Sequence, residues 1–116
     1  RGEGFGLGVA EAMLLGLPAV VSDYSATKEF CNQSNSIPVP CKIVSPCENQ
    51  RDHLTYSYVT KWAEPDISFA ADALRRLYDD SSFRECVGLR AQEYIKEYFS
   101  LRRFKKSIME LLRCLD

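Results

Sequence analysis

The sequence predicts a small α/β domain with few parallel strands and with helices toward the C-terminal end. Residues 9–15 form an apolar, helix-forming run, and residues 19–22 follow as a short strand that stays apolar until Ser22. A continuously apolar strand is typical of a parallel sheet that is covered on both faces. From residue 66 onward, apolar side chains recur at helical spacing instead. Helix, buried strand and further helices together indicate an α/β fold.

The N-terminal segment is predicted as loop, helix, strand and turn. Glycines at positions 2, 4, 6 and 8 oppose regular structure before residue 9. Gly16 is expected to end the helix as its C′ residue, with Pro18 just beyond it. Residues 23–26 are predicted as a turn and residues 27–31 as a single helical turn.

The middle of the chain gives weaker signals. Residues 37–44 have strand character, but Pro38 and Pro40 would push that strand to a sheet edge. Residues 47–60 are polar and predicted as loop, and residues 62–66 as a turn that leads into the next helix.

Three amphipathic helices are predicted in the C-terminal part. Asp66 is expected to cap the first, a capping box from Ser82 to Glu85 to open the second, and Ser100 to cap the third. The predicted buried faces are Ile67, Ala70, Leu74, Leu77 and Tyr78 in the first helix, Phe83, Val87, Ala91, Tyr94, Ile95 and Tyr98 in the second, and Phe104, Ile108, Leu111, Leu112 and Leu115 in the third.

Composition and charge fit one globular domain. The 116 residues are 46% hydrophobic and 27% charged, and the formal net charge is −1, so no global field would recruit nucleic acid or an anionic membrane. Residues 5–21 are the longest nearly apolar stretch, but Glu11, glycines and Pro18 interrupt it, so no membrane span is expected. The chain begins at Arg1 rather than Met, which leads us to expect missing upstream sequence and leaves targeting unread.

The cysteines predict neither a disulfide framework nor a metal site. Five cysteines are an odd number without paired spacing, which favours reduced thiols in a cytosolic protein. Cys41, Cys47 and His53 lack the C-x-x-C spacing of a zinc knuckle, so no bound metal is expected.

Glu11 is the only charged residue between Phe5 and Val21. An unpaired buried carboxylate is costly, so Glu11 needs a partner or an opening to solvent. One interpretation is structural: Glu11 is the third residue of its helix and bonds back to the helix start. The other is functional: its carboxylate accepts hydrogen bonds from paired hydroxyls, as a ribose would offer.

The turn Gly4-Phe5-Gly6-Leu7-Gly8 precedes the predicted helix and presents successive backbone amides. Such a turn can bind phosphate through oriented N–H groups and the helix dipole, or it can be a tight turn without a ligand. Phe5 is expected to pack against the loop rather than to stack on a base. Glu3 and Glu11 would repel a lone phosphate, but they would suit hydroxyl groups on either side of a diphosphate. A nucleotide-sugar fits this order, with Glu3 at the sugar and Glu11 at the ribose.

A dinucleotide-binding motif is the main alternative at this loop. Asp23 ends a strand where a ribose-binding acid could stand. The pattern G-x-G-x-x-G fails, however, because its third glycine would fall on Leu7 or on Val9.

Residues 3–25 resemble the E-x7-E signature of retaining glycosyltransferases of family 4. The run Glu3-Gly-Phe-Gly-Leu-Gly-Val-Ala-Glu11-Ala-Met, followed by Leu15-Gly-Leu-Pro-Ala-Val-Val-Ser-Asp23, matches nearly every position of E-G-F-G-L-x-x-x-E-A-M-A-x-G-x-P-V-V. The segment Trp62-Ala-Glu-Pro-Asp66 and the C-terminal helix after Phe99-Ser100 agree with the same family. The resemblance implies that residues 1–116 are the distal part of the C-terminal, Rossmann-like domain of a GT-B enzyme, whose N-terminal acceptor domain is absent.

The resemblance also implies roles for individual residues. Glu3 would contact the donor sugar in the catalytic centre, and Glu11 would hold the ribose hydroxyls. Gly4 and the backbone amides of Phe5, Gly6 and Leu7 would face the sugar and the diphosphate. Similar enzymes need no metal or cofactor, and they retain the anomeric configuration through front-side attack assisted by the diphosphate. The donor would be a nucleotide-diphosphate-sugar; its base, its sugar and the acceptor are not specified.

Two departures from the family pattern stand out. Many relatives carry Gly-Gly where this chain has Ser25-Ala26, which puts the geometry of that loop in question. The basic residues that neutralise the diphosphate in similar enzymes lie upstream of the signature, and Arg1 is not an obvious substitute. The isolated chain is therefore expected to be inactive, because transfer needs the acceptor held in the interdomain cleft.

Two other functions remain open: a nucleotide-sugar epimerase on the same scaffold and an interaction module without catalysis. The parent protein is expected to be cytoplasmic, with peripheral membrane contact left open because the last helix is basic. Its excess of three charges over Glu110 and Asp116 favours an ordinary solvated face. In similar enzymes this helix packs across the domain junction, which would leave its apolar stripe partly bare here.

Overall fold

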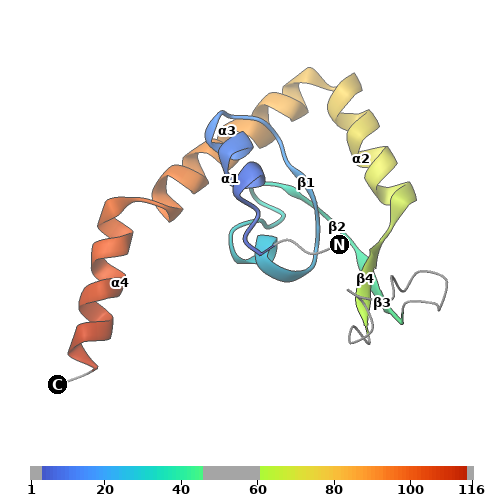
Figure 1. Cartoon of the computed structure of the whole chain (residues 1–116). Coiled ribbons are helices and arrows are strands. Elements are labelled where there is room, and N and C mark those ends of the chain that lie inside the picture. The colour runs from blue at the N-terminus through green and yellow to red at the C-terminus, as the bar shows by residue number, and fades with distance from the viewer. Residues whose placement is uncertain (1–3, 46–60, 115–116) are drawn as a thin grey trace.

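The structure, a computed structural model, describes residues 4–45 and 61–114. These residues form a mixed α/β arrangement of helices and short strands (Figure 1). The elements in chain order are α1 (Leu7–Leu14), β1 (Val20–Ser22), the 3-10 helix η1 (Ser25–Glu29), β2 (Ile37–Val39), β3 (Cys41–Val44), β4 (Trp62–Pro65), α2 (Ile67–Asp79), α3 (Ser81–Tyr98) and α4 (Leu101–Arg113). Within the described residues, no helix combines the length and the apolarity needed to cross a bilayer.

The predicted passage from helix to strand is confirmed, with a helix end set by Gly16. Gly16 takes φ of 78°, and its N–H donates to the Met13 carbonyl at 3.0 Å. The Leu17 N–H donates to the Ala12 carbonyl, also at 3.0 Å. These two bonds satisfy the last carbonyls of α1 and turn the chain into β1. β1 pairs with β2 in parallel register, with Val20 opposite Ile37, as the apolar strand predicted.

The predicted strand over residues 37–44 is divided into β2 and β3 at Pro40. Proline lacks the N–H that a continuous ladder would use, so the chain changes partner there. β3 pairs antiparallel with β4. The prediction of a turn at residues 62–66 was therefore wrong: a strand forms because β3 supplies its hydrogen bonds, a contact that local propensity does not encode. The predicted loop at residues 47–60 lies outside the described residues.

Aspartates cap α2 and α3. Asp66 accepts hydrogen bonds from the Phe69 N–H at 3.0 Å and from the Ser68 hydroxyl at 2.7 Å, and these bonds lower the pKa of its carboxyl. Asp80 accepts from the Phe83 N–H at 2.8 Å and caps α3. The predicted capping box from Ser82 was wrong, because Asp80 offers an N-cap acceptor two residues earlier.

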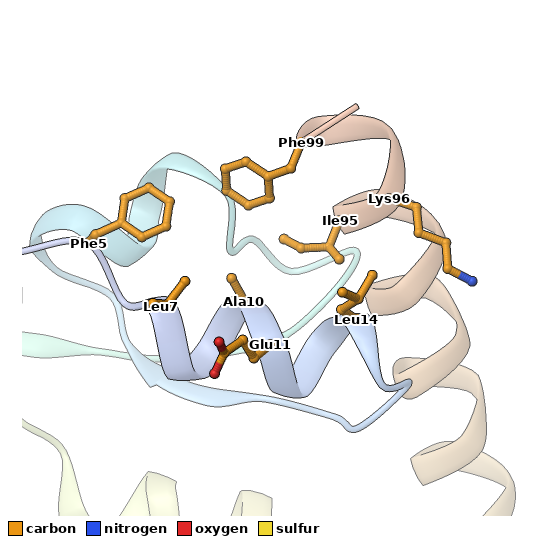
Figure 2. Close-up of a pocket in the computed structure, with 8 residues that line it drawn as sticks. All are labelled: Phe5, Leu7, Ala10, Glu11, Leu14, Ile95, Lys96 and Phe99. Atoms are coloured by element: carbon orange, nitrogen blue, oxygen red, sulfur yellow. The ribbon is translucent and has the colours of Figure 1, made fainter. Parts of the chain in front are cut away.

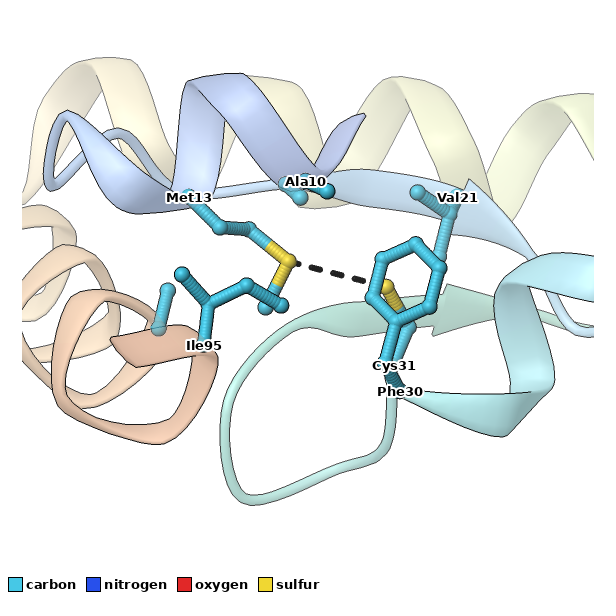
Figure 3. Close-up of a cluster of buried hydrophobic side chains, with 8 residues drawn as sticks. Ala10, Met13, Val21, Phe30, Cys31 and Ile95 are labelled. Carbon is cyan, nitrogen blue, oxygen red and sulfur yellow. Dashed lines mark hydrogen bonds between the residues drawn. The ribbon is translucent and has the colours of Figure 1, made fainter. Parts of the chain in front are cut away.

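The core lies between α1, β1 and the C-terminal half of α3 (Figure 3). Its buried members are Ala10, Met13, Ala19, Val21, Phe30, Cys31, Ala91 and Ile95. The Cys31 Sγ lies 3.7 Å from the Met13 Sδ, and burial raises the pKa of the Cys31 thiol. The described cysteines are all free, as predicted, and Cys47 lies outside the described residues.

The apolar faces predicted for α2 and α3 are buried to different extents. The α3 face is confirmed in part, since Val87, Ala91 and Ile95 are buried while Phe83, Tyr94 and Tyr98 are half-buried. On α2, Leu77 is buried, but Ile67, Leu74 and Tyr78 are exposed because α3 and the strands contact one side only. These faces were therefore predicted only in part.

The α4 face is not buried. Ser100 caps the helix as predicted, accepting from the Arg103 N–H at 3.2 Å. None of the α4 residues is buried, because the helix extends away from the rest of the molecule (Figure 1). The predicted burial of Phe104, Ile108, Leu111 and Leu112 was wrong for this chain. Leu115 lies outside the described residues.

Candidate functional site

The glycine-rich turn leads directly into α1. Gly6 takes φ of 88° and is the N-cap residue of the helix. A Cβ at this position would lie 2.8 Å from the Thr27 Cγ2, so Gly6 is required by both backbone and packing. At Gly4 and Gly8, no described atom lies within 4 Å of a built Cβ. Packing within the described residues therefore does not explain these two glycines.

The N-cap residue of α1, Gly6, has no side chain with which to cap the helix. The Val9 and Ala10 amides both donate to the Gly6 carbonyl, at 3.0 and 3.1 Å. The positive end of the helix dipole and the first-turn amides favour an anion at this position. Glu3, which was predicted at the donor sugar, lies outside the described residues.

Glu11 is the fifth residue of α1, and α1 has no acidic residue in its first turn. The interpretation of Glu11 as a third-position residue that bonds back to the helix start was therefore wrong. The reason is the left-handed Gly6, which lets the helix begin at Leu7, two residues before the predicted start. Glu11 is exposed, and within residues 4–45 and 61–114 its carboxylate has neither a hydrogen bond nor an ion pair. Of the two predicted outcomes, the opening to solvent is the one observed.

The turn, the end of β1 and η1 meet at one edge. α1 precedes β1 and returns through the Gly16 turn, so the start of α1 and the carboxyl end of β1 lie on the same side. A Cβ built on Gly6 would contact the Thr27 side chain, so η1 lies against the turn. The Asp23 amide donates to the Val39 carbonyl at 2.8 Å and extends the parallel pairing to this edge. Ligands in α/β proteins bind at the carboxyl ends of parallel strands.

Charged groups at this edge include Asp23 and Lys28. The Lys28 Nζ lies 3.0 Å from the Asp23 Oδ1, and both side chains are about half exposed. An exposed ion pair of this kind adds little stability. Lys28 is a cation in the element that packs on the turn, and sequence reasoning did not single it out.

Ser25 is the sole non-glycine residue with positive φ among the described residues, at 63°. It is the first residue of the pair Ser25-Ala26, for which the sequence resemblance led us to expect Gly-Gly. Left-handed backbone is strained for residues with a Cβ, and such strain is found at turns and functional sites. Ser25 therefore adopts a backbone conformation that glycine takes without strain.

We expect Ser25→Gly to stabilise the protein. Relief of left-handed strain is worth about 1–2 kcal/mol, and the greater freedom of glycine in the unfolded chain offsets about 0.5–1 kcal/mol of it. Urea denaturation should show a higher free energy of unfolding for this variant. Ser25→Ala keeps the Cβ and should show no gain; equal gains in both variants would contradict the strain at Ser25.

An apolar groove adjoins the turn along α1 (Figure 2). It has a volume of about 390 Å³, and its lining residues are Phe5, Leu7, Ala10, Glu11, Leu14, Ile95, Lys96 and Phe99. The Phe5 ring lies 5.7 Å from the Phe30 ring and 5.6 Å from the Phe99 ring, measured between centroids. The prediction that Phe5 packs on the protein is thereby confirmed. Lys96 and Phe99 were not predicted as lining residues from the sequence, because only the packing of α3 on α1 brings them to the groove.

No group of three or more histidine, cysteine or acidic side chains that could hold a metal occurs in the described part of the chain. Comparisons with protein-family models, curated proteins and solved structures found no match to this chain. Any functional assignment therefore depends on the chain's own motif and geometry.

Proposed function

We propose that the chain is the distal part of a Rossmann-like, nucleotide-sugar-binding domain in a GT-B glycosyltransferase. The parent enzyme would transfer a sugar from a nucleotide-diphosphate donor with retention of configuration and without a metal or cofactor. The chain would supply part of the donor site. Glu3 would act at the donor sugar, Gly4 to Leu7 would hold the diphosphate, and Glu11 would bind the ribose.

One observation carries this proposal: the helix N-terminus that follows the glycine-rich turn stands at the carboxyl edge of the parallel pair, with Glu11 exposed one turn along the helix. The diphosphate needs amides and a positive dipole, and the ribose needs an acceptor about one turn away. Beside those amides, no described atom lies within 4 Å of a Cβ built at Gly4 or Gly8. A tight turn that binds no ligand would not require this combination of helix terminus, exposed carboxylate and unexplained glycines.

The apolar surface of α1 supports the proposal that further domain structure covers this chain. Leu7 and Leu14, which are seven residues apart on α1 and line the same groove, are 60% and 47% exposed. Large apolar side chains gathered in this way mark a surface that another element buries. The remaining strands of a Rossmann-like sheet would provide such cover.

The test is the reaction of the whole protein. Thermal shift against UDP-glucose, GDP-mannose and UDP-N-acetylglucosamine should first identify a stabilising donor. Proton NMR of the product should then show a glycoside with the anomeric configuration of the donor. An inverted anomeric centre would contradict the family assignment, and conversion of the donor to its sugar epimer without a glycoside would identify the epimerase instead. Donor binding without any turnover would favour the non-catalytic module.

A further inference from the structure

Phe5 is the large side chain that attaches the glycine-rich turn to the rest of the molecule. At its neighbours Gly4 and Gly8, no described atom lies within 4 Å of a built Cβ, so these positions pack against nothing in the described residues. Glycine-rich backbone also loses much conformational freedom when it becomes ordered. The contacts of Phe5 therefore contribute much of what holds the turn in place.

Phe5 packs on two rings that come from different elements. Its centroid lies 5.7 Å from that of Phe30 and 5.6 Å from that of Phe99, and the latter two rings are 5.9 Å apart. Phe30 is 1% exposed and belongs to the core, whereas Phe99 is 47% exposed. Figure 2 shows the side chains of Phe5 and Phe99 beside the start of α1. Loss of the Phe30 ring would leave a cavity in the core, but loss of the Phe99 ring would not.

The backbone of Phe99 is fixed at the junction of two helices. Phe99 is the C-cap residue of α3, and its N–H donates to the carbonyl of buried Ile95 at 3.0 Å. The next residue, Ser100, caps α4. The Phe99 ring also meets the Tyr98 ring at 4.9 Å and 80°, an edge-to-face contact. The ring that contacts Phe5 is therefore held by α3 and does not move with the turn.

A half-exposed ring that is fixed by one helix and packs on the turn before another helix can orient that turn. Tilted and edge-to-face ring pairs are favourable beyond the area that they bury. We propose that Phe99 is a positioning residue: by packing on Phe5, it holds the glycine-rich turn in the conformation from which α1 begins. The consequence for donor binding rests on the proposed function, whereas the effect on the turn does not.

Amide hydrogen exchange, followed by NMR in the whole protein, tests the effect on the turn without any ligand. The Val9 and Ala10 N–H groups donate to the Gly6 carbonyl, so their exchange reports opening of the turn. In Phe99→Ala this exchange should be about fivefold faster, as expected for the loss of one aromatic pair. The Leu17 N–H, which is bonded at the other end of α1, should exchange at an unchanged rate. Unchanged exchange at Val9 and Ala10 would overturn the proposal.

Further variants show whether Phe99 acts through Phe5. In a Phe5→Ala background, Phe99→Ala should produce no further acceleration, because the contact is already lost. Equal acceleration in both backgrounds would overturn the proposal and make Phe99 a general support of the fold. Phe99→Tyr keeps the ring and should exchange like the wild type. Tyr78→Ala is the matched control, because it removes an exposed ring from α2 and should not change the exchange.

Donor affinity tests the consequence at the site. The ligand is whichever of UDP-glucose, GDP-mannose and UDP-N-acetylglucosamine stabilises the wild-type protein. Phe99→Ala should bind it about two- to fivefold more weakly, because affinity falls with the fraction of molecules whose turn is correctly placed, and Phe99→Tyr should restore the affinity. Faster exchange with unchanged affinity would overturn the link between the turn and the donor. If none of the three ligands binds the wild type, the proposed function fails, while the exchange at Val9 and Ala10 still decides the role of Phe99.

Discussion

Gly88→Ala should destabilise the protein by about 2–3 kcal/mol, although the same change in an exposed helix interior is stabilising by about 1 kcal/mol. Gly88 is buried in the middle of α3. A Cβ built on it would stand 2.1 Å from the Gly16 carbonyl oxygen and 3.1 Å from the Gly16 carbonyl carbon. Both are backbone atoms, so no rotamer change can remove the overlap.

The overlap between a Cβ built on Gly88 and the Gly16 carbonyl would occur where α1 and α3 are in contact. Gly16 is the left-handed residue that ends α1, and two backbone hydrogen bonds hold it and Leu17 to the helix. Beside it, the Gln92 side-chain amide donates to the Leu14 carbonyl at 2.9 Å. Moving α3 outward to admit a methyl group would loosen this bond and the core beneath it. Overpacking against backbone is among the mechanisms that produce large losses of stability.

Urea denaturation followed by circular dichroism measures this effect. Gly8→Ala is the matched control, because it is the same substitution in a helix with no described atom within 4 Å of the new Cβ. The control should keep or raise the free energy of unfolding while Gly88→Ala lowers it. If both variants gained stability, the close approach of α3 to Gly16 would be wrong.

Features of the fold that are encoded locally were predictable from the sequence. Gly16 followed by Pro18 indicated the end of α1, and Asp66 and Ser100 indicated helix starts, because each acts within one turn of chain. Strand β4 was not predictable in this way, since its hydrogen bonds come from β3 across a long connection. Gly88 carried no signal at all: its role arises from a contact with a residue far away in the sequence.

In the candidate site, too, only the features that are encoded locally could be predicted from the sequence. The glycine-rich turn and Glu11 were predicted from sequence, because backbone freedom and an isolated charge are visible there. The place of Glu11 along α1 was not, since it depends on the left-handed conformation of Gly6. Lys28, held by Asp23, reaches the edge only because η1 packs on the turn.

Glu11→Ala should weaken nucleotide-sugar binding by the whole protein about 100-fold, if the carboxylate holds the ribose as proposed. Two hydrogen bonds from ribose hydroxyls to a carboxylate are charge-assisted, and together they are worth roughly 3 kcal/mol. Glu11→Gln keeps one acceptor oxygen without the charge, so its loss should be smaller, about tenfold. Isothermal titration with the donor found by thermal shift measures both variants.

A purely structural role for Glu11 would give a different pattern. Glu11 is exposed and outside the first turn of α1, so its removal should leave the melting temperature unchanged while affinity falls. Glu93→Ala removes an exposed glutamate from α3 and should change neither quantity. Glu11→Ala should weaken the binding of a nucleoside diphosphate by the same factor as the binding of the nucleotide-sugar, because both ligands contain the ribose. If a folded Glu11→Ala protein kept its affinity for the donor, the assignment of Glu11 to the ribose would be wrong. If Glu11→Ala lost affinity for the nucleotide-sugar but not for the nucleoside diphosphate, Glu11 would contact the sugar instead.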